Sequence, residues 1–151
     1  MHVDYKLDVP ATPERPALLN ALDTWVGIRP PSPLFVHARM LTLVFSRHDQ
    51  LLVSLDAYIG SGLAAIDCVE VPAVRGSGQL RLNISAAPEE EVRLGISDGW
   101  RCRYDNTRRC LHFAFPRAAT DPTYYRIAST LAIGLRDGEL SDIYIEELRE
   151  P

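Results

Sequence analysis

Residues 100–115 read WRCRYDNTRRCLHFAF. Apolar and polar side chains alternate on both sides of a polar centre, which is typical of two half-buried strands joined by a short turn. If Thr107 and Arg108 form the tip, the apolar and aromatic side chains share one face, and a shift of one residue would destroy this separation. The stretch therefore predicts a β-hairpin whose core face consists of Trp100, Cys102, Tyr104, Leu111, Phe113 and Phe115.

The other face of this predicted hairpin is mostly polar and basic. It carries Arg101, Arg103, Asp105, Cys110, His112 and Ala114. Arg103 lies beside His112 in this register, and Arg126 on a neighbouring strand would add to the cluster, as would Arg108 and Arg109 at the tip. Because arginine forks bind carboxylates and phosphates, this face indicates an anion or an acidic protein partner. A face that contacts only water is the alternative.

The cysteines do not indicate a metal or redox site. Cys102 and Cys110 fall on opposite faces of the hairpin, and with Cys68 they make an odd number without a CxxC motif. A zinc site needs Cys or His ligands that converge on one point, so we predict no metal and no cofactor. The sequence also has no GxSxG, GxGxxG, HExxH or P-loop motif, which leaves open whether the protein is an enzyme.

The rest of the chain predicts a mainly β protein with one N-terminal helix. Residues 13–26 place leucine and tryptophan at helical spacing, and residues 3–9 alternate like a short strand. From about 34 to 148, turn signals recur about every 8–12 residues, which predicts about eight or nine antiparallel strands in a barrel-like or two-layer meander. We expect one domain, 1–151, which could contain two degenerate copies of one antiparallel unit.

Three segments in this region receive specific assignments. Residues 34–46 and 125–135 are apolar over most of their length, and we predict one long strand from each. Residues 79–85 and 91–97 flank the segment AAPEE, and we predict that they pair as a hairpin.

Acidic side chains lie within otherwise apolar strands, namely Asp56, Asp67 and Asp142. In the hairpin that contains Asp56, we pair Phe45 with Leu52 and Leu41 with Asp56. A carboxylate in apolar surroundings either acquires a raised pKa or finds a partner. Asp56 and Tyr58 are therefore candidates for acid–base chemistry, and a position that faces water is the alternative.

The hairpin at residues 131–148 turns at Asp137–Gly138 and is apolar on both faces. We place Tyr144 on the same face as Leu131. A sheet covered on both sides needs a second layer, which the helix, a second copy of the chain or an apolar barrel lumen with a small ligand could supply. The residues that would line such a pocket are Asp56, Tyr58, Trp100, Tyr104 and Tyr144.

Residues 100–148 resemble a small bacterial domain family of unknown function. The resemblance rests on Tyr104–Asp105, on Asp137–Gly138 and on the segments CLHFAF, STLAIGL and LSDIYIEEL. It covers about a third of the chain, which differs from the family in a long N-terminal extension and a longer loop, PRAATDPTYY. The resemblance implies an all-β meander, and it implies no activity because none is assigned to the family.

Composition narrows the function further. The net charge of −4 disfavours nucleic acid as a partner. No apolar run approaches the roughly 20 residues of a membrane helix, no signal peptide is visible, and the thiols suit a reducing cytoplasm. We predict a bacterial, cytoplasmic, non-catalytic binding module of the immunity, antitoxin or adaptor type. A small barrel enzyme or carrier of the cyclase or isomerase type is the alternative. The predicted binding residues are Trp100, Arg101, Arg103, Tyr104, His112, Arg126 and Tyr144.

Overall fold

The computed structural model describes most of the β region of the chain. The described residues are 5–9, 33–38, 41–47, 50–57, 69–84, 91–93, 101–105, 107–115, 121–128 and 130–146. The predicted helix at 13–26 lies outside this description, as do Tyr58, Asp67, Cys68 and Trp100. No helix in the described ranges is long and apolar enough to cross a membrane.

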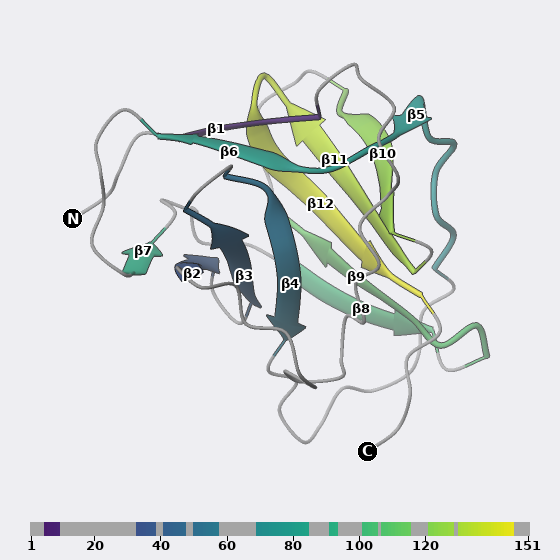
Figure 1. The fold of residues 1–151 in the computed structure, drawn as a ribbon. Coiled ribbons are helices and arrows are strands. Elements are labelled where there is room, and N and C mark those ends of the chain that lie inside the picture. The colour runs from purple at the N-terminus through teal and green to yellow at the C-terminus, as the bar shows by residue number, and fades with distance from the viewer. Residues whose placement is uncertain are drawn as a thin grey trace.

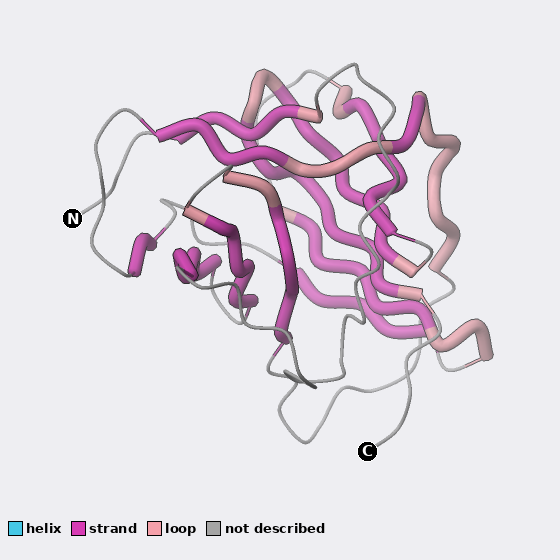
Figure 2. Tube along the Cα trace, viewed as in Figure 1, coloured by secondary structure: helices cyan, strands magenta, loops and turns pink. Residues whose placement is uncertain are grey.

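Twelve strands in three sheets make up this part of the chain (Figures 1 and 2). The six-stranded sheet has the order β5 (Gly76–Ser77), β10 (Thr123–Ala128), β11 (Leu131–Arg136), β12 (Glu139–Ile145), β9 (Cys110–Ala114) and β8 (Arg101–Asp105). The four-stranded sheet has the order β4 (Leu52–Ala57), β3 (Leu41–Ser46), β2 (Pro33–Ala38) and β7 (Glu91–Arg93). The third sheet pairs β1 (Tyr5–Asp8) with β6 (Arg81–Ile84).

The sheets confirm a mainly β protein and correct its predicted architecture. Most neighbouring strands are antiparallel, but β5 joins β10 and β7 joins β2 in parallel, so two of the sheets are mixed. Among the described residues no sheet closes into a barrel. The predicted pairing of residues 79–85 with 91–97 is wrong, because β6 pairs with β1 and β7 pairs with β2.

Both predicted long strands are hairpins instead. Residues 34–46 contribute β2 and β3, which pair antiparallel, and residues 125–135 contribute β10 and β11, which do the same. A strand of 13 residues would extend roughly 44 Å, whereas strands usually have about 5–6 residues. The residues between β2 and β3 and between β10 and β11 include no glycine or proline that would indicate a turn. The length of the two segments is therefore the sequence feature that indicates a hairpin in each.

The β3–β4 pairing starts as predicted and then shifts by one residue. Phe45 faces Leu52, but a bulge next to Phe45 gives Leu41 the partner Ala57. An extra residue on one strand reverses the face of every later side chain relative to a regular ladder. The predicted pairing of Leu41 with Asp56 is therefore wrong, and the side chain of Asp56 lies outside the description.

A bulge of the same kind corrects the β11–β12 hairpin. Leu135 faces Leu140 next to the turn, but the register then shifts between Gly134 and Leu135. Tyr144 consequently pairs with Ala132, and the prediction that placed it with Leu131 is wrong. Tyr144 moves to the opposite face of the sheet.

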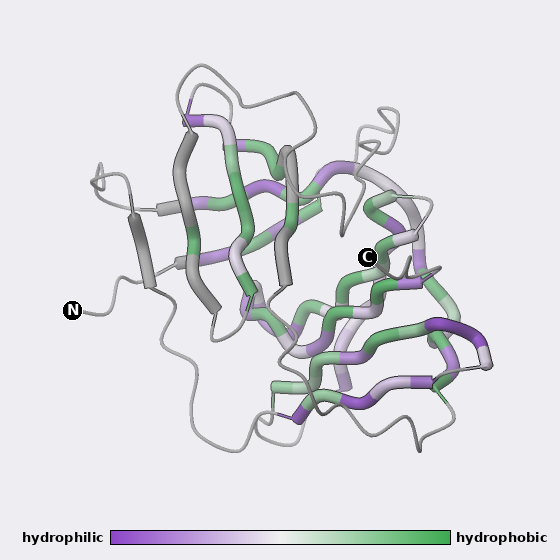
Figure 3. The backbone as a smooth tube through the Cα atoms, turned by 90° about the horizontal axis from the view of Figure 1, so that it is seen from below, coloured by the Kyte–Doolittle hydropathy of each residue, from purple (hydrophilic) through white to green (hydrophobic). Residues whose placement is uncertain are grey.

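One hydrophobic core is shared by all three sheets. Much of the six-stranded sheet is hydrophobic (Figure 3), and the hydrophobic side chains of one of its faces belong to this core. Among its members are Leu7 and Leu82 of the two-stranded sheet, Leu41, Leu43 and Phe45 of the four-stranded sheet, and Leu111, Phe113, Ile133 and Ile143 of the six-stranded sheet. The other face of the six-stranded sheet carries polar side chains and a smaller apolar cluster, and we call it the outer face.

Candidate functional site

Two rows of cross-strand neighbours define the centre of the outer face. The first row runs from β8 to β10 through Arg103, His112, Tyr144, Ala132 and Arg126. The second row consists of Arg101, Ala114, Asp142, Gly134 and Tyr124. The predicted register of residues 100–115 is confirmed, because Tyr104 faces Leu111 and Arg103 faces His112. The cysteines also lie on opposite faces, as predicted.

His112 lies at the centre of a hydrogen-bond network on this face. Its side chain is only 6% exposed, and its Nε2 lies 2.8 Å from Oδ1 of Asp142. Its Nδ1 lies 2.8 Å from Nη2 and 3.3 Å from Nε of Arg103. Because a guanidinium can only donate, Nδ1 must be the acceptor, and the ring proton lies on Nε2 and is donated to Asp142. In this geometry His112 is therefore neutral.

Asp142 fixes the other side of the imidazole. Its Oδ2 accepts a hydrogen bond of 2.7 Å from the Ser141 hydroxyl and a longer one of 3.4 Å from the Tyr124 hydroxyl. Burial would raise the pKa of Asp142, but this pKa lies below its ordinary value, chiefly because of the hydrogen bond from His112 and to a smaller extent because of those from Ser141 and Tyr124. Asp142 is thus an ionised acceptor that holds three donors in place.

Two tyrosines enclose this network. The Tyr144 ring stacks on the His112 ring with 4.1 Å between centroids and 5° between planes, and Tyr124 packs edge-on against Tyr144 at 6.1 Å. Burial raises the pKa of both phenols, so they stay protonated at neutral pH. Tyr144 was predicted to contact a ligand or partner, but the structure buries it, with 5% of the residue exposed.

The segment from Val69 to Gly78 covers the part of the outer face around Tyr144. Val69 and Val71 pack with Cys110, Ala132 and Tyr144. At one end the Val69 N–H donates to Oδ2 of Asp105, and at the other end the Gly78 N–H donates to the Arg126 carbonyl. Burial raises the pKa of the Cys110 thiol to about 11, so this cysteine is an unreactive packing residue.

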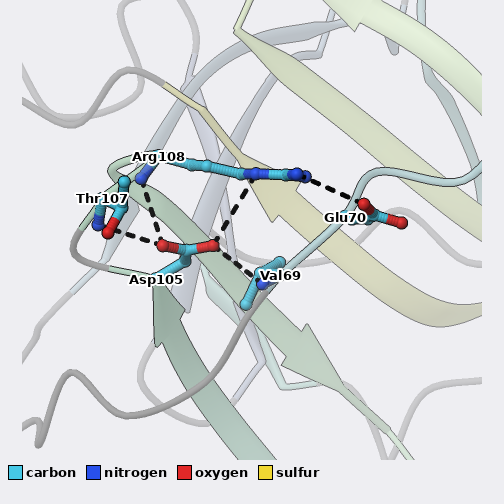
Figure 4. A network of polar contacts seen from close by, with 5 residues as sticks. All are labelled: Val69, Glu70, Asp105, Thr107 and Arg108. Atoms are coloured by element: carbon cyan, nitrogen blue, oxygen red, sulfur yellow. Dashed lines mark hydrogen bonds and ion pairs between the residues drawn. The ribbon is translucent and has the colours of Figure 1, made fainter.

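Asp105 anchors this segment to the hairpin tip (Figure 4). Its carboxylate accepts the N–H groups of Val69 at 3.0 Å, Thr107 at 3.0 Å and Arg108 at 3.1 Å. The hydrogen bond from Val69 is the main reason why the pKa of Asp105 is lowered. Arg108 in turn pairs with Glu70 at 3.2 Å. Asp105 and Arg108 are therefore occupied by contacts within the chain.

Some arginines of the predicted cluster form ion pairs within the chain, and others do not. Arg126 pairs with Glu146, and it lies four strands from Arg103, which corresponds to about 19 Å at usual strand spacing. The expectation that Arg126 lies close to Arg101 and Arg103 is therefore wrong. Arg101 is exposed, and no ion pair or hydrogen bond joins it to the described residues.

Part of this network could be predicted from sequence and part could not. The Arg103–His112 pair follows from the hairpin register, and Asp142 stands out as an acidic residue in an apolar strand. The contact of His112 with Asp142 depends on the pairing of β9 with β12, which β10 and β11 separate in the sequence. The bulge beside Gly134 places Gly134 opposite Asp142 and Ala132 opposite Tyr144. No local signal in the sequence indicates either. Of the other predicted residues, Tyr104 packs against the core, and Asp56, Tyr58 and Trp100 have side chains outside the described part.

No protein-family model matches the sequence, and no curated protein matches it either.

Proposed function

We propose that the protein is a non-catalytic binding module that recognises carboxylate groups of an acidic protein partner through Arg103 and Arg101. The observation that carries the proposal is the way in which Arg103 is held. Its Nε and Nη2 both point to the neutral Nδ1 of His112, and it has no other hydrogen bond or ion pair among the described residues. A neutral acceptor orients the guanidinium and leaves its charge uncompensated.

The orientation leaves the binding edge of Arg103 available. A guanidinium has five N–H groups, and the contact with His112 uses the edge formed by Nε and Nη2. The edge formed by Nη1 and Nη2 remains, and it matches the two oxygens of a carboxylate in a bidentate pair. Because His112 is itself fixed by Asp142 and Tyr144, part of the rotamer entropy of Arg103, about 2 kcal/mol in total, is lost before the partner arrives.

Arg101 supplies a second cation beside the first. It lies two residues before Arg103 on β8, and side chains at this spacing project from the same face about 7 Å apart. The side chain is exposed, so it gives the partner electrostatic attraction with less orientation than Arg103 provides. Of the seven predicted binding residues, the proposal uses Arg101, Arg103 and the supporting His112. Trp100 lies outside the described residues and stays a prediction.

The His112–Asp142 pair also resembles the base and its orienting carboxylate in a catalytic site. The only lone pair of the neutral ring already accepts from Arg103, and Asp142 has its donors in place. A fully satisfied network of this kind favours a positioning role over proton transfer. The barrel enzyme alternative needs a closed sheet, and the sheets described in this chain stay open.

Titration with a glutamate-rich peptide of about eight residues tests the proposal by isothermal calorimetry, with its glutamine counterpart as the uncharged probe. We expect Arg103→Gln to weaken binding of the glutamate peptide by about tenfold or more, because a charged hydrogen bond is lost. We also expect Arg103→Lys to weaken binding, since lysine keeps the charge and lacks the fork.

Arg75→Gln is the matched control for this experiment. Arg75 is exposed, its backbone N–H donates to the Tyr124 carbonyl on β10, and its substitution removes the same charge at the opposite end of the sheet from Arg103. The affinity of the Arg75→Gln variant should stay within about twofold of the wild type. Equal losses in the Arg75 and Arg103 variants would show that only net charge matters and would overturn the proposal, as would equal binding of the glutamine peptide.

A further inference from the structure

The strand that carries Arg101 and Arg103 lies at the edge of the six-stranded sheet. β8 pairs with β9 on one side, and no strand in the described ranges pairs with its other side (Figure 1). The five residues of β8 pair with β9 in regular register, without a bulge and without proline. Bulges, prolines and charged side chains are the usual devices that keep an edge strand from pairing further. β8 has no bulge and no proline, so only its charged side chains restrict which strand can pair with it.

We infer that the acidic partner binds by adding an extended segment along β8 as a further strand of the sheet. This inference rests on the proposed function, and it adds the mode of binding and the pattern of the partner. Alternate residues of β8 direct their N–H and C=O groups away from β9, and an added strand would satisfy them.

The spacing of the arginines predicts the pattern of the added strand. Arg101 and Arg103 lie two residues apart on the outer face, so the partner places carboxylates at alternate positions, also about 7 Å apart. The residue between the two carboxylates points to the core face. There it meets Cys102 and Tyr104, which are half-buried and pack against the core, so an apolar residue fits this position. The predicted partner segment alternates acidic and apolar residues.

Charge selects this partner over a second copy of the same strand. The third outer-face residue of β8, Asp105, is buried and its carboxylate is occupied by Val69, Thr107 and Arg108. The exposed charge along the edge is therefore positive. Two β8 strands that paired with each other would bring arginines together, which is unfavourable, whereas an acidic strand brings opposite charges together.

Backbone methylation separates strand addition from simple charge attraction. The probes are the peptide Glu-Val-Glu-Val-Glu-Val-Glu and two forms of it, N-methylated at every glutamate or at every valine. We expect the unmodified peptide to bind and one methylated form to bind at least about tenfold more weakly, because methylation removes the N–H groups that face β8. We also expect bound peptide to slow amide hydrogen exchange at alternate residues of β8.

Each outcome of this experiment has a distinct meaning. If all three peptides bind equally and the amide exchange of β8 does not change, strand addition is wrong and carboxylate recognition by Arg101 and Arg103 stands. If the unmodified peptide fails to bind the wild type, carboxylate recognition fails and strand addition fails with it. If the Arg101→Gln, Arg103→Gln double variant retains both binding and protection of β8, the edge binds without its arginines, which overturns the acidic pattern.

Discussion

Replacing Asp142 with alanine is expected to lower the free energy of unfolding by about 2–4 kcal/mol, measured by urea denaturation at pH 7. The substitution removes the acceptor for His112 Nε2–H at 2.8 Å and for the Ser141 hydroxyl at 2.7 Å. The side chain of Asp142 is 13% exposed and that of His112 is 6% exposed, so water does not easily replace the lost acceptor. Buried donors without acceptors carry most of the expected cost.

Asp142→Asn separates the charge of this residue from its shape. The folded-state pKa of Asp142 is lowered, so its ionised form stabilises the fold. This contribution is complete above the unfolded pKa of about 3.9 and disappears as the pH falls through the lower folded pKa. The stability difference between wild type and Asp142→Asn should therefore shrink below about pH 4. An Asp142→Ala variant as stable as the wild type at pH 7 would refute the network.

Replacing Gly134 with alanine is expected to destabilise the fold by about 1–3 kcal/mol through overpacking. A Cβ at this position would lie 2.7 Å from Ser141 Oγ, 2.8 Å from Tyr124 Cε1 and 3.1 Å from Asp142 Oδ2. Contacts this short force Ser141 and Tyr124 to move, and both side chains donate to Asp142. The missing side chain is thus what allows the network to assemble.

Gly76→Ala is the matched control for Gly134→Ala. Gly76 also lies in a strand of the six-stranded sheet, but a Cβ at this position would have no atom within 4 Å apart from those of Gly76 and its two chain neighbours. We expect its effect on the free energy of unfolding to stay within about 0.5 kcal/mol, because the substitution adds no clash. Thermal or urea unfolding of both variants checks the pair. A Gly134 variant that matches the Gly76 variant would mean that the space beside Asp142 is not needed.

The accuracy of the sequence-based registers depends on how differently the two faces of a hairpin are composed. In residues 100–115 the apolar side chains share one face, so only one register separates them from the polar ones, and this register is confirmed. The β3–β4 and β11–β12 hairpins are apolar on both faces, so an extra residue changes the faces without changing the pattern. The bulges beside Phe45 and Gly134 therefore have no signal in the sequence pattern.

The candidate site shows that sequence pattern also fails to predict contacts between strands that are distant in the chain. Arg103 and His112 are neighbours within one hairpin, so the local sequence pattern predicts their contact. Asp142 reaches His112 because β12, which follows β9 only after two other strands, pairs with it directly. Arg126 was expected near Arg103 because the strand order was unknown, and two intervening strands from the C-terminal hairpin separate β10 from β9. The sequence pattern does not determine which strands pair when they lie far apart in the chain.

The tautomer of His112 tests the central claim most directly, because the claim is that a neutral imidazole orients Arg103 and leaves its charge available. Long-range proton–nitrogen NMR correlation of the His112 ring at pH 7.5 distinguishes the two ring nitrogens. The predicted result is a protonated Nε2 and an unprotonated Nδ1, as the contacts with Asp142 and Arg103 require. A proton on Nδ1, in either the neutral or the doubly protonated ring, would contradict the account.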